Sequence, residues 1–258
     1  KPKPTEKRRA PATVNRLHTA LSAALTWGVD HLGWLEQNPA RLVKRMAESN
    51  TETRFLTTEE IDTLRDACNA QPWGRLWLLV IMGIITGARQ GELLSLRWKQ
   101  VSWHEGRRLA TALLGRTKNG EPRVLSIVGE AYDELQKAHA RDSSDELTSN
   151  DWKDLLVFRS PTKPKQHFVG FTNQWKAARE AAGLWHPGDK DKHVKFHTTR
   201  HTAASHMVQN GIDLYTVQKI LGHKTPHVTQ RYSHLQVEHQ IEAVESVWAK
   251  KEPNDSAS

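Results

Sequence analysis

The sequence predicts a mainly α-helical protein that contains a small antiparallel β-sheet, an α+β fold. Three observations support this prediction. Apolar residues recur every three or four positions in most segments, which is typical of amphipathic helices. The uninterrupted apolar run at 76–85 is too short to span a bilayer and indicates a buried helix. Two short apolar runs flank the Asn-Gly pair at 119–120, which is a strong signal for a β-hairpin.

Residues 1–50 form the first predicted domain, and residues 51–56 form the linker after it. The segment opens with a basic, proline-interrupted arm, KPKPTEKRRAP. Thr13 is the expected cap of the helix that follows. The apolar positions of this helix are Val14, Leu17, Leu21, Leu25, Val29 and Leu32. A single amphipathic helix needs a surface on which to pack, so we expect this apolar face to meet another element.

Residues 57–258 form the second predicted domain. Thr57 and Glu60 have the spacing of a capping box and are expected to start its first helix. The predicted hairpin has strands at 109–114 and 123–128, with Lys118 near its tip. Beyond an acidic segment, helices are predicted over 171–183, 198–211, 212–222 and 236–250.

The charge of the chain is unevenly distributed. The formal net charge is +8, yet residues 130–154 contain eight acidic and three basic residues, so this segment carries −5 and the remainder +13. Such asymmetry predicts a polyanion on one side of the protein and solvent on the other, although a merely solubilising surface is the alternative. Cys68 has no partner for an intramolecular disulfide, and no N-terminal segment resembles a signal peptide, which favours the cytoplasm.

The stretch HTTRHTAASH at 197–206 has three possible interpretations: a metal site, a phosphate site, or the polar face of an ordinary helix. His197 and His201 have the spacing that zinc helices use. However, Arg200 shares their face, and Thr198 stands where a zinc helix usually carries glutamate. The chain has neither a zinc-type cysteine pair nor a glycine-rich phosphate loop, so we expect no metal and no nucleotide cofactor.

Five motifs in order, TGARQGEL, TKNG, HTTRH, LGH and TQRYSH, resemble the tyrosine recombinase (phage integrase) family. The resemblance extends from about residue 54 to about residue 240, and TVNRLHTALSAALTWGVDHLGWLEQNPA is similar to the closing helices of the family's core-binding, DNA-clamping domain. The resemblance implies the family's catalytic fold preceded by part of that domain. It also implies that Tyr232 is the nucleophile and that five residues surround a DNA phosphate: Arg89, Lys118, His197, Arg200 and His223.

The chemistry of phosphodiester cleavage suits these residue types. Guanidiniums such as those of Arg89 and Arg200 match the charge that develops on the non-bridging oxygens. Because tyrosine has a pKa near 10, Tyr232 needs a proton acceptor, for which His197 is the expected residue. Lys118 is expected to protonate the leaving 5′ oxygen.

Three residues remain to be assigned, His223 to catalysis and Glu92 and His201 to supporting contacts. His223 is expected to donate another hydrogen bond to the phosphate. Glu92 lies one turn after Arg89 and is expected to orient it, and His201 is expected to support the pocket. With these assignments, the sequence favours a phosphate site over a metal site at 197–206.

Two departures from the family pattern are visible. Many members carry an acid and a leucine between the histidine and the arginine, where this chain has Thr198 and Thr199. This change is expected to alter how the helix start is capped or packed. Relatives also generally have further helices before the position of residue 12, so the chain is expected to be a fragment that holds DNA less tightly.

The resemblance implies a site-specific DNA recombinase, an integrase of mobile DNA in the bacterial cytoplasm or nucleoid, that works through a covalent 3′-phosphotyrosine. The alternatives are a type IB topoisomerase-like enzyme that cuts and reseals without strand exchange, and a non-catalytic DNA-binding regulator. The expected partners are double-stranded DNA with specific recombination sites and accessory DNA-bending or directionality factors.

The segment 236–250 after Tyr232 is the expected docking helix of a DNA-bound homotetramer. Its apolar stripe consists of Val237, Ile241, Val244 and Trp248. The resemblance favours docking on a neighbouring protomer, and packing of the stripe on its own domain is the alternative.

Overall fold

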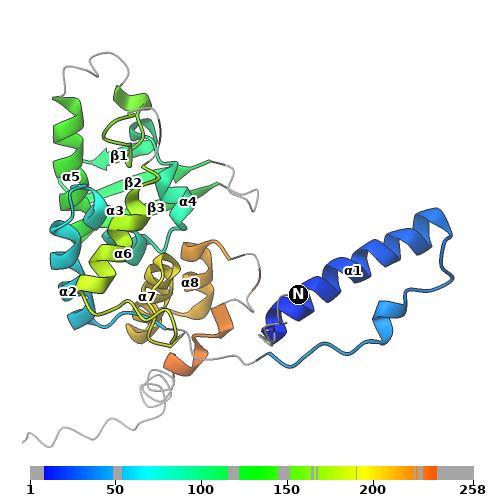
Figure 1. Cartoon of the computed structure of the whole chain (residues 1–258). Coiled ribbons are helices and arrows are strands. Elements are labelled where there is room, and N and C mark those ends of the chain that lie inside the picture. Colours follow the sequence, from blue (N-terminus) through cyan, green and yellow to red (C-terminus); the bar gives the residue numbers. More distant parts are fainter. Residues whose placement is uncertain are drawn as a thin grey trace, which may run out of the picture. The chain divides into compact units, whose positions relative to one another are not determined.

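The computed structural model describes residues 9–48, 54–115, 122–144, 152–163, 166, 168–189, 191–223, 225 and 229–236. The chain divides into two compact units, Lys1–Thr51 and Glu52–Ser258 (Figure 1). Each unit is described by itself. The predicted fold class is confirmed, because helices predominate and the described residues contain one small antiparallel sheet.

The first unit consists of helix α1 (Pro11–Leu32) and the short 3₁₀ helix η1 (Pro39–Leu42). The predicted cap at Thr13 is wrong, because the helix already begins at Pro11 with Ala10 as its N-cap. Proline suits this first position, since its fixed φ is helical and it lacks an N–H that would have no acceptor. Asn38 ties the returning chain to α1 by donating to the Ser22 carbonyl at 2.8 Å.

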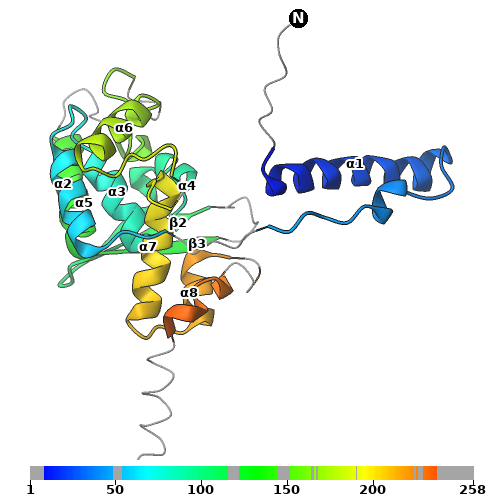
Figure 2. The same ribbon diagram turned by 60° about the horizontal axis from the view of Figure 1, so that its bottom comes forward.

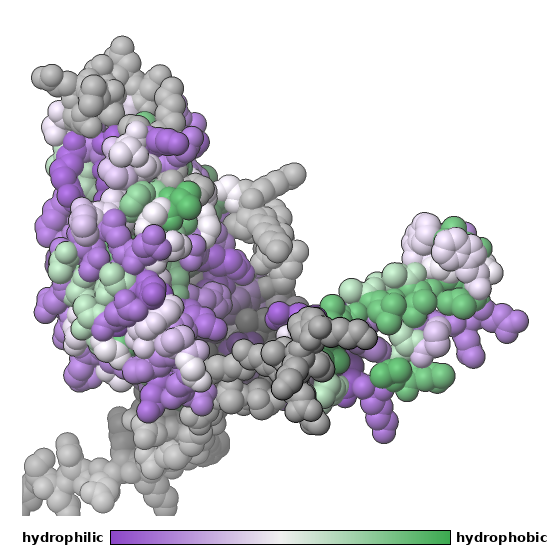
Figure 3. All heavy atoms as spheres, viewed as in Figure 1, coloured by the Kyte–Doolittle hydropathy of each residue, from purple (hydrophilic) through white to green (hydrophobic). Residues whose placement is uncertain are grey.

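Part of the apolar face of α1 remains uncovered. Leu17 is 52% exposed and Leu21 is 56% exposed. Figure 3 shows hydrophobic residues gathered along this helix. The expected partner surface for this face is therefore not supplied by the described residues of the unit.

The second unit is built around helix α3 (Leu76–Thr86), whose residues are all buried except Ile85. The predicted buried helix is thereby confirmed. Among the described residues, no helix is long and apolar enough to cross a membrane. The predicted capping box of α2 (Thr58–Asn69) is also confirmed, with Thr57 and Glu60 exchanging both hydrogen bonds.

The remaining helices of the second unit pack against α3 or against its neighbours. They are α4 (Gln90–Leu94), α5 (Gly129–Ser143), α6 (Phe171–Ala181), α7 (Phe196–Gln209) and α8 (Leu214–Leu221), with 3₁₀ turns η2 (Trp98–Gln100), η4 (Trp152–Asp154) and η5 (Ser233–Gln236). Helix α7 packs against α3 and α8 (Figure 2). The HTTRH stretch therefore lies on a helix that packs against the buried helix α3.

The sheet has the strand order β1 (Val101–His104), β2 (Leu109–Leu114) and β3 (Arg123–Val128), all antiparallel. The predicted strands of the hairpin are confirmed, and Leu114 pairs with Arg123 at its last register position. Alternate residues such as Leu125 and Ile127 are buried, and the sheet packs on α3 and α5. Lys118 lies outside the described residues.

Two expectations about burial are wrong. The acidic segment was expected to face solvent, but Asp142 on α5 is fully buried and accepts hydrogen bonds from Arg75, Arg159 and Trp98. The helical spacing of Tyr215 with Val208, Ile212 and Leu221 predicts packing inside the fold, yet Tyr215 on α8 is 65% exposed. Both errors arise because spacing identifies a helix face but not the element that covers it.

Candidate active site

The first turn of helix α7 contains the two threonines that depart from the family pattern. The Thr198 hydroxyl accepts a hydrogen bond from the backbone N–H of Lys195 at 3.0 Å, and it therefore caps the helix start. Thr199 is fully buried and lies against Gly83 of α3. A Cβ atom on Gly83 would come within 2.6 Å of the Thr199 hydroxyl oxygen, so the two helices approach closely here.

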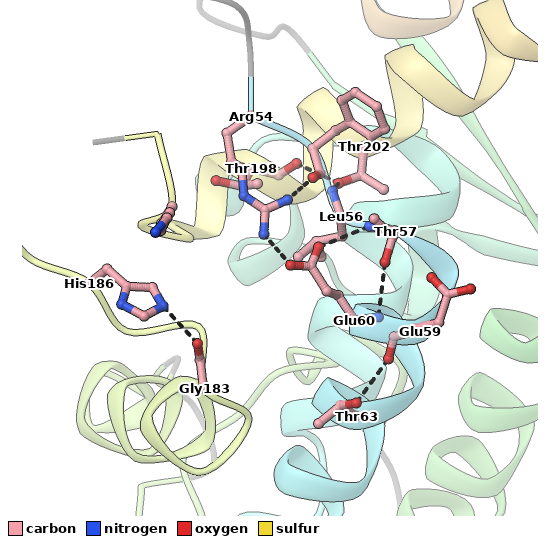
Figure 4. A network of polar contacts seen from close by, with 12 residues as sticks. Arg54, Leu56, Thr57, Glu59, Glu60, Thr63, Gly183, His186, Thr198 and Thr202 are labelled. Atoms are coloured by element: carbon pink, nitrogen blue, oxygen red, sulfur yellow. Dashed lines mark hydrogen bonds and ion pairs between the residues drawn. The ribbon is translucent and has the colours of Figure 1, made fainter. Parts of the chain in front are cut away.

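The back of α7 is held by the segment that enters α2 (Figure 4). The backbone N–H of Leu56 donates to the Thr202 hydroxyl at 2.9 Å, and the Leu56 carbonyl accepts from His206 Nε2 at 3.0 Å. Thr202 in turn donates to the Thr198 carbonyl at 2.9 Å. These neutral hydrogen bonds hold α7 through Thr198, Thr202 and His206, and they do not involve His197, Arg200 or His201.

Arg200 is the buried centre of the site. Its side chain donates to the Gly87 carbonyl at 2.6 Å and to the Leu221 carbonyl at 2.8 Å, and the residue is 3% exposed. Burial, followed by the charges of Arg89 and Arg123, lowers the pKa of Arg200 to about 9. The guanidinium is therefore a cation that the fold holds among dipoles and other cations.

Glu92 organises the neighbouring arginines. Its carboxylate accepts hydrogen bonds from the Arg89 backbone N–H at 2.8 Å and from Arg89 Nη1 at 2.9 Å. The same carboxylate accepts from Arg123 Nη2 at 2.6 Å. Three guanidiniums, those of Arg89, Arg123 and Arg200, thus lie near one carboxylate and leave an excess of positive charge.

Arg123 is not among the site residues expected from the sequence. A signal for it is present in the strand RVLSIV, because Arg123 is in phase with the buried Leu125 and Ile127. An arginine on the buried phase of a strand needs acceptors inside the fold. Strand alternation alone would therefore have identified this residue as a candidate.

Tyr232 lies directly before η5 and is 2% exposed. Its hydroxyl oxygen is 2.5 Å from His201 Nδ1. Burial raises the pKa of Tyr232 to about 12, although the charges of Arg231 and Arg200 oppose this effect. Burial and the neighbouring His197 lower the pKa of His201 to about 3, so the ring is neutral and its Nδ1 can accept the tyrosine hydrogen bond.

The other two histidines flank this pair. The ring of His197 lies 4.8 Å from that of His201, between centroids, in an edge-to-face arrangement. Loss of hydration, followed by the charge of Arg200, lowers the pKa of His197, although much of its surface is exposed. His223 follows Gly222 at the end of α8, and its Nδ1 contacts the Thr229 hydroxyl at 3.0 Å. Burial, with Arg200 next, lowers the pKa of His223 to about 3.

The structure thus gathers most of the expected residues in one region. Arg89, Glu92, Arg200 and His223 lie around the ends of α4, α7 and α8, and the Tyr232–His201 pair adjoins them. The hydroxyl of Tyr232 contacts His201 rather than His197. No group of three metal-binding side chains is present in the described part of the chain.

A surplus of guanidinium charge beside a tyrosine hydroxyl is an arrangement suited to binding a phosphate ester. The chain belongs to the phage integrase family, whose model matches residues 54–239. This match covers most of the second unit and includes the described residues of the site.

Individual relatives support this assignment. The integrase of Haemophilus phage HP1 is 28% identical over 233 residues, which cover 90% of this chain and 59% of that protein. The integrase of Escherichia phage 186 is 28% identical over 236 residues, which cover 91% of this chain and 60% of that protein. The chain therefore spans about three fifths of the length of these relatives.

Solved structures share the fold. The Tn1549 transposon integrase in complex with circular intermediate DNA superposes with a TM-score of 0.69 at 17% identity, covering 94% of this chain and 82% of that chain. The catalytic domain of bacteriophage HP1 integrase gives a TM-score of 0.53 at 24% identity, covering 75% of this chain and 95% of that domain.

Proposed function

We propose that the protein is a site-specific DNA recombinase that cleaves and rejoins DNA through a covalent 3′-phosphotyrosine, integrating or excising mobile DNA. The observation that carries this proposal is the excess cationic charge of Arg89, Arg123 and Arg200 beside the hydroxyl of Tyr232. The family membership and the DNA complexes of structural neighbours, such as the Tn1549 integrase, support DNA as the substrate.

In the proposed reaction, the Tyr232 oxygen attacks phosphorus and the bond to the 5′ oxygen breaks. Arg89 and Arg200 stabilise the negative charge on the non-bridging oxygens, and His223 adds a hydrogen bond. Lys118 protonates the leaving 5′ oxygen. The phosphotyrosine keeps the energy of the broken bond, so a 5′ hydroxyl can reverse the reaction without a nucleotide cofactor.

The proton of Tyr232 must leave before or during attack. In the free protein its pKa is raised to about 12, and the hydroxyl is held by His201. An approaching phosphate would have to compete with this hydrogen bond. We assign His201 to holding the tyrosine before DNA binds, and His197, whose ring adjoins His201, to accepting the proton in the DNA complex.

The first unit and the C-terminal segment complete the proposal. Residues 1–50 are proposed to be the C-terminal part of a helical DNA-clamping domain. The segment 236–250 is proposed to dock on a neighbouring protomer in a DNA-bound tetramer. The setting would be the bacterial cytoplasm or nucleoid, and accessory bending or directionality factors are further proposed partners.

A suicide DNA substrate tests the proposed activity. A nick beside the cleavage position releases a short strand, so the covalent protein–DNA adduct accumulates and can be resolved by denaturing electrophoresis. The adduct is expected with the wild-type protein, including in EDTA. A protein that binds this DNA without forming the adduct would be a regulator.

A second duplex distinguishes the remaining alternative. Recombinant strands are expected when a partner duplex with the same recombination site is added. Resealing without exchange would instead indicate topoisomerase-like activity.

A further inference from the structure

Arg123 is a largely buried cation at the start of β3 to which the proposed reaction assigns no step. It pairs with Leu114 at the last position of the β2–β3 ladder, and its side chain is only 9% exposed. Its guanidinium lies near those of Arg89 and Arg200, because, in addition to burial, the charge of Arg89 lowers the pKa of Arg123 and the charge of Arg123 lowers the pKa of Arg200.

The acceptors of Arg123 are shared with both candidate phosphate-binding arginines. Its Nη2 donates to Glu92, which also accepts from Arg89 Nη1. Its Nη1 donates to the Ile220 carbonyl at 3.0 Å and to the Leu221 carbonyl. The Leu221 carbonyl is also the acceptor of Arg200 Nη2 at 2.8 Å. One side chain therefore connects to Arg89 through a carboxylate and to Arg200 through a helix-terminal carbonyl.

The same side chain supports the backbone that leads to His223. Gly222 ends α8 with a φ of +67°, a conformation that favours glycine. A Cβ atom at this position would lie 3.1 Å from Arg123 Cδ. The chain thus passes tightly over Arg123 immediately before it reaches His223.

Stability of the free fold does not explain an arginine at this position. Burial lowers the pKa of Arg123, Glu92 opposes this effect, and Arg89 adds to it. Its Nε–H is buried and has no acceptor among the described residues. Since a buried ion pair often stabilises no better than apolar residues of similar size, a selective advantage in the loaded site is the better explanation.

We propose that Arg123 is a positioning residue for the proposed cleavage reaction. It holds Arg89 through Glu92, and it holds Arg200 and the approach to His223 through the end of α8. Arg123 thereby keeps the guanidiniums of Arg89 and Arg200 at a spacing that fits one phosphate. This inference rests on the proposed function, and the experiments below separate the two.

The first experiment measures single-turnover cleavage of the suicide substrate by Arg123→Met and Arg123→Lys. Because small displacements of catalytic groups cost large factors in rate, Arg123→Met should cleave roughly 10- to 100-fold more slowly, with DNA binding little changed. Arg123→Lys should lie between it and the wild type, because it keeps the charge but loses the fork of donors. Wild-type cleavage by Arg123→Met would overturn the proposal, as would equal losses in binding and cleavage.

Arg108→Met is the matched control. Arg108 lies just before β2 of the same sheet, pairs with Asp133, and has a side chain that is 64% exposed. The Arg108→Met variant loses the same charge as Arg123→Met but keeps the hydrogen bonds among Arg89, Glu92 and Arg123. It should therefore cleave at the wild-type rate, and a loss equal to that of Arg123→Met would assign the effect to net charge.

A double-mutant cycle tests whether Arg123 acts through Arg89. If it does, adding Arg123→Met to Arg89→Ala should slow cleavage by much less than it does in the wild type. If the fold losses in cleavage rate of the two single variants multiply in the double variant, the two residues act independently, contrary to the proposal.

A third readout does not depend on cleavage. In the free protein, the side-chain Nε–Hε resonances of Arg89 and Arg200 should shift in Arg123→Met and stay unchanged in Arg108→Met. Unchanged resonances in Arg123→Met would overturn the positioning role.

If the wild type forms no adduct, the proposed function fails, and these resonances still decide the role of Arg123. Thermal unfolding checks the fold, and Arg123→Lys carries the test if the methionine variant unfolds.

Discussion

Two clusters in the second unit each place arginines around one carboxylate, and they differ in how the arginines are bonded and in their excess of positive charge. At Asp142, whose side chain is 1% exposed, Arg75 and Arg159 both bond directly to the carboxylate, with Trp98 as a third donor. At Glu92, Arg89 and Arg123 share the carboxylate, whereas the acceptors of Arg200 in the described part of the chain are two backbone carbonyls.

The difference separates a structural cluster from a candidate binding cluster. Asp142 accepts from both of its arginines and links α5 to the residues before α3 and after η4. The Glu92 cluster has three guanidiniums to one carboxylate, a larger excess of positive charge than the two to one at Asp142, and a further anion would offset it. Loss of Asp142 should therefore damage folding, whereas loss of a polar group at the candidate site should mainly damage chemistry.

The largest expected effect concerns Tyr232→Phe. Because only the hydroxyl is lost, the variant should bind DNA normally and form no covalent adduct. The hydrogen bond to His201 contributes about 1 kcal/mol to stability, so the unfolding free energy should change little. Denaturing electrophoresis and chemical denaturation measure the two effects, and an adduct yield equal to that of wild type would remove Tyr232 as the nucleophile.

Arg200→Ala and Arg89→Ala should each slow cleavage by on the order of a hundredfold or more, because the charge they meet develops in the transition state. DNA binding should weaken much less. Single-turnover rates and equilibrium binding on the same duplex provide the comparison. Losses of equal size in both measurements would make these arginines simple phosphate anchors and would weaken the contrast with Asp142.

Asp142→Ala should show the opposite pattern. Removing one partner leaves Arg75 and Arg159 as buried cations, which should cost about 3–5 kcal/mol of unfolding free energy. Urea denaturation measures this cost, and cleavage per folded molecule should stay near the wild-type value. The exposed Asp154→Ala is the control, since its pair with Lys99 is solvent-accessible. A stable Asp142→Ala variant with slow cleavage would break the comparison.

The pH dependence of stability gives a smaller effect. The pKa of His201 is lowered to about 3, below its ordinary value of 6.5, so the unfolded chain binds more protons between these pH values. Stability should therefore fall as pH falls from about 6.5 to about 3, and His201→Gln should make this fall less steep. Unfolding free energies across this range test the prediction, with the exposed His104→Gln as the control. An unchanged slope in His201→Gln would show that the ring is not held neutral.

The smallest expected effect on cleavage concerns assembly. Ile241 and Val244, both changed to serine, should leave the fold and the covalent adduct largely intact while reducing synaptic complexes and recombinant product. Native gel electrophoresis with DNA measures the complexes. A lower unfolding temperature of the DNA-free monomer would instead indicate that this segment packs on its own domain.

Local sequence patterns correctly predicted the elements whose structure depends on residues close together in the sequence. The apolar run at 76–85 is a buried helix, and Thr57 with Glu60 forms a capping box, because both depend on neighbours within one or two turns. The strands around residue 118 follow from alternation and turn chemistry. The gathering of Arg89, Arg200 and His223 was expected from the family resemblance rather than from spacing.

Other features depend on contacts between distant segments. Asp142 is buried because Arg75 reaches it from 67 residues away, and sequence-local reasoning assigned it to solvent. Arg123 finds acceptors on α4 and α8, which no spacing rule connects. The pairing of Tyr232 with His201 likewise depends on how η5 meets α7.

The close approach of Gly83 and Thr199 has an evolutionary consequence. The space between α3 and α7 holds one hydroxyl and has no room for a methyl group on the opposite helix, since that methyl would lie 2.6 Å from the threonine oxygen. Any enlargement at position 83 would push away the helix that carries Arg200. The two positions are therefore coupled, and a larger residue at 83 is expected only where residue 199 is smaller than threonine.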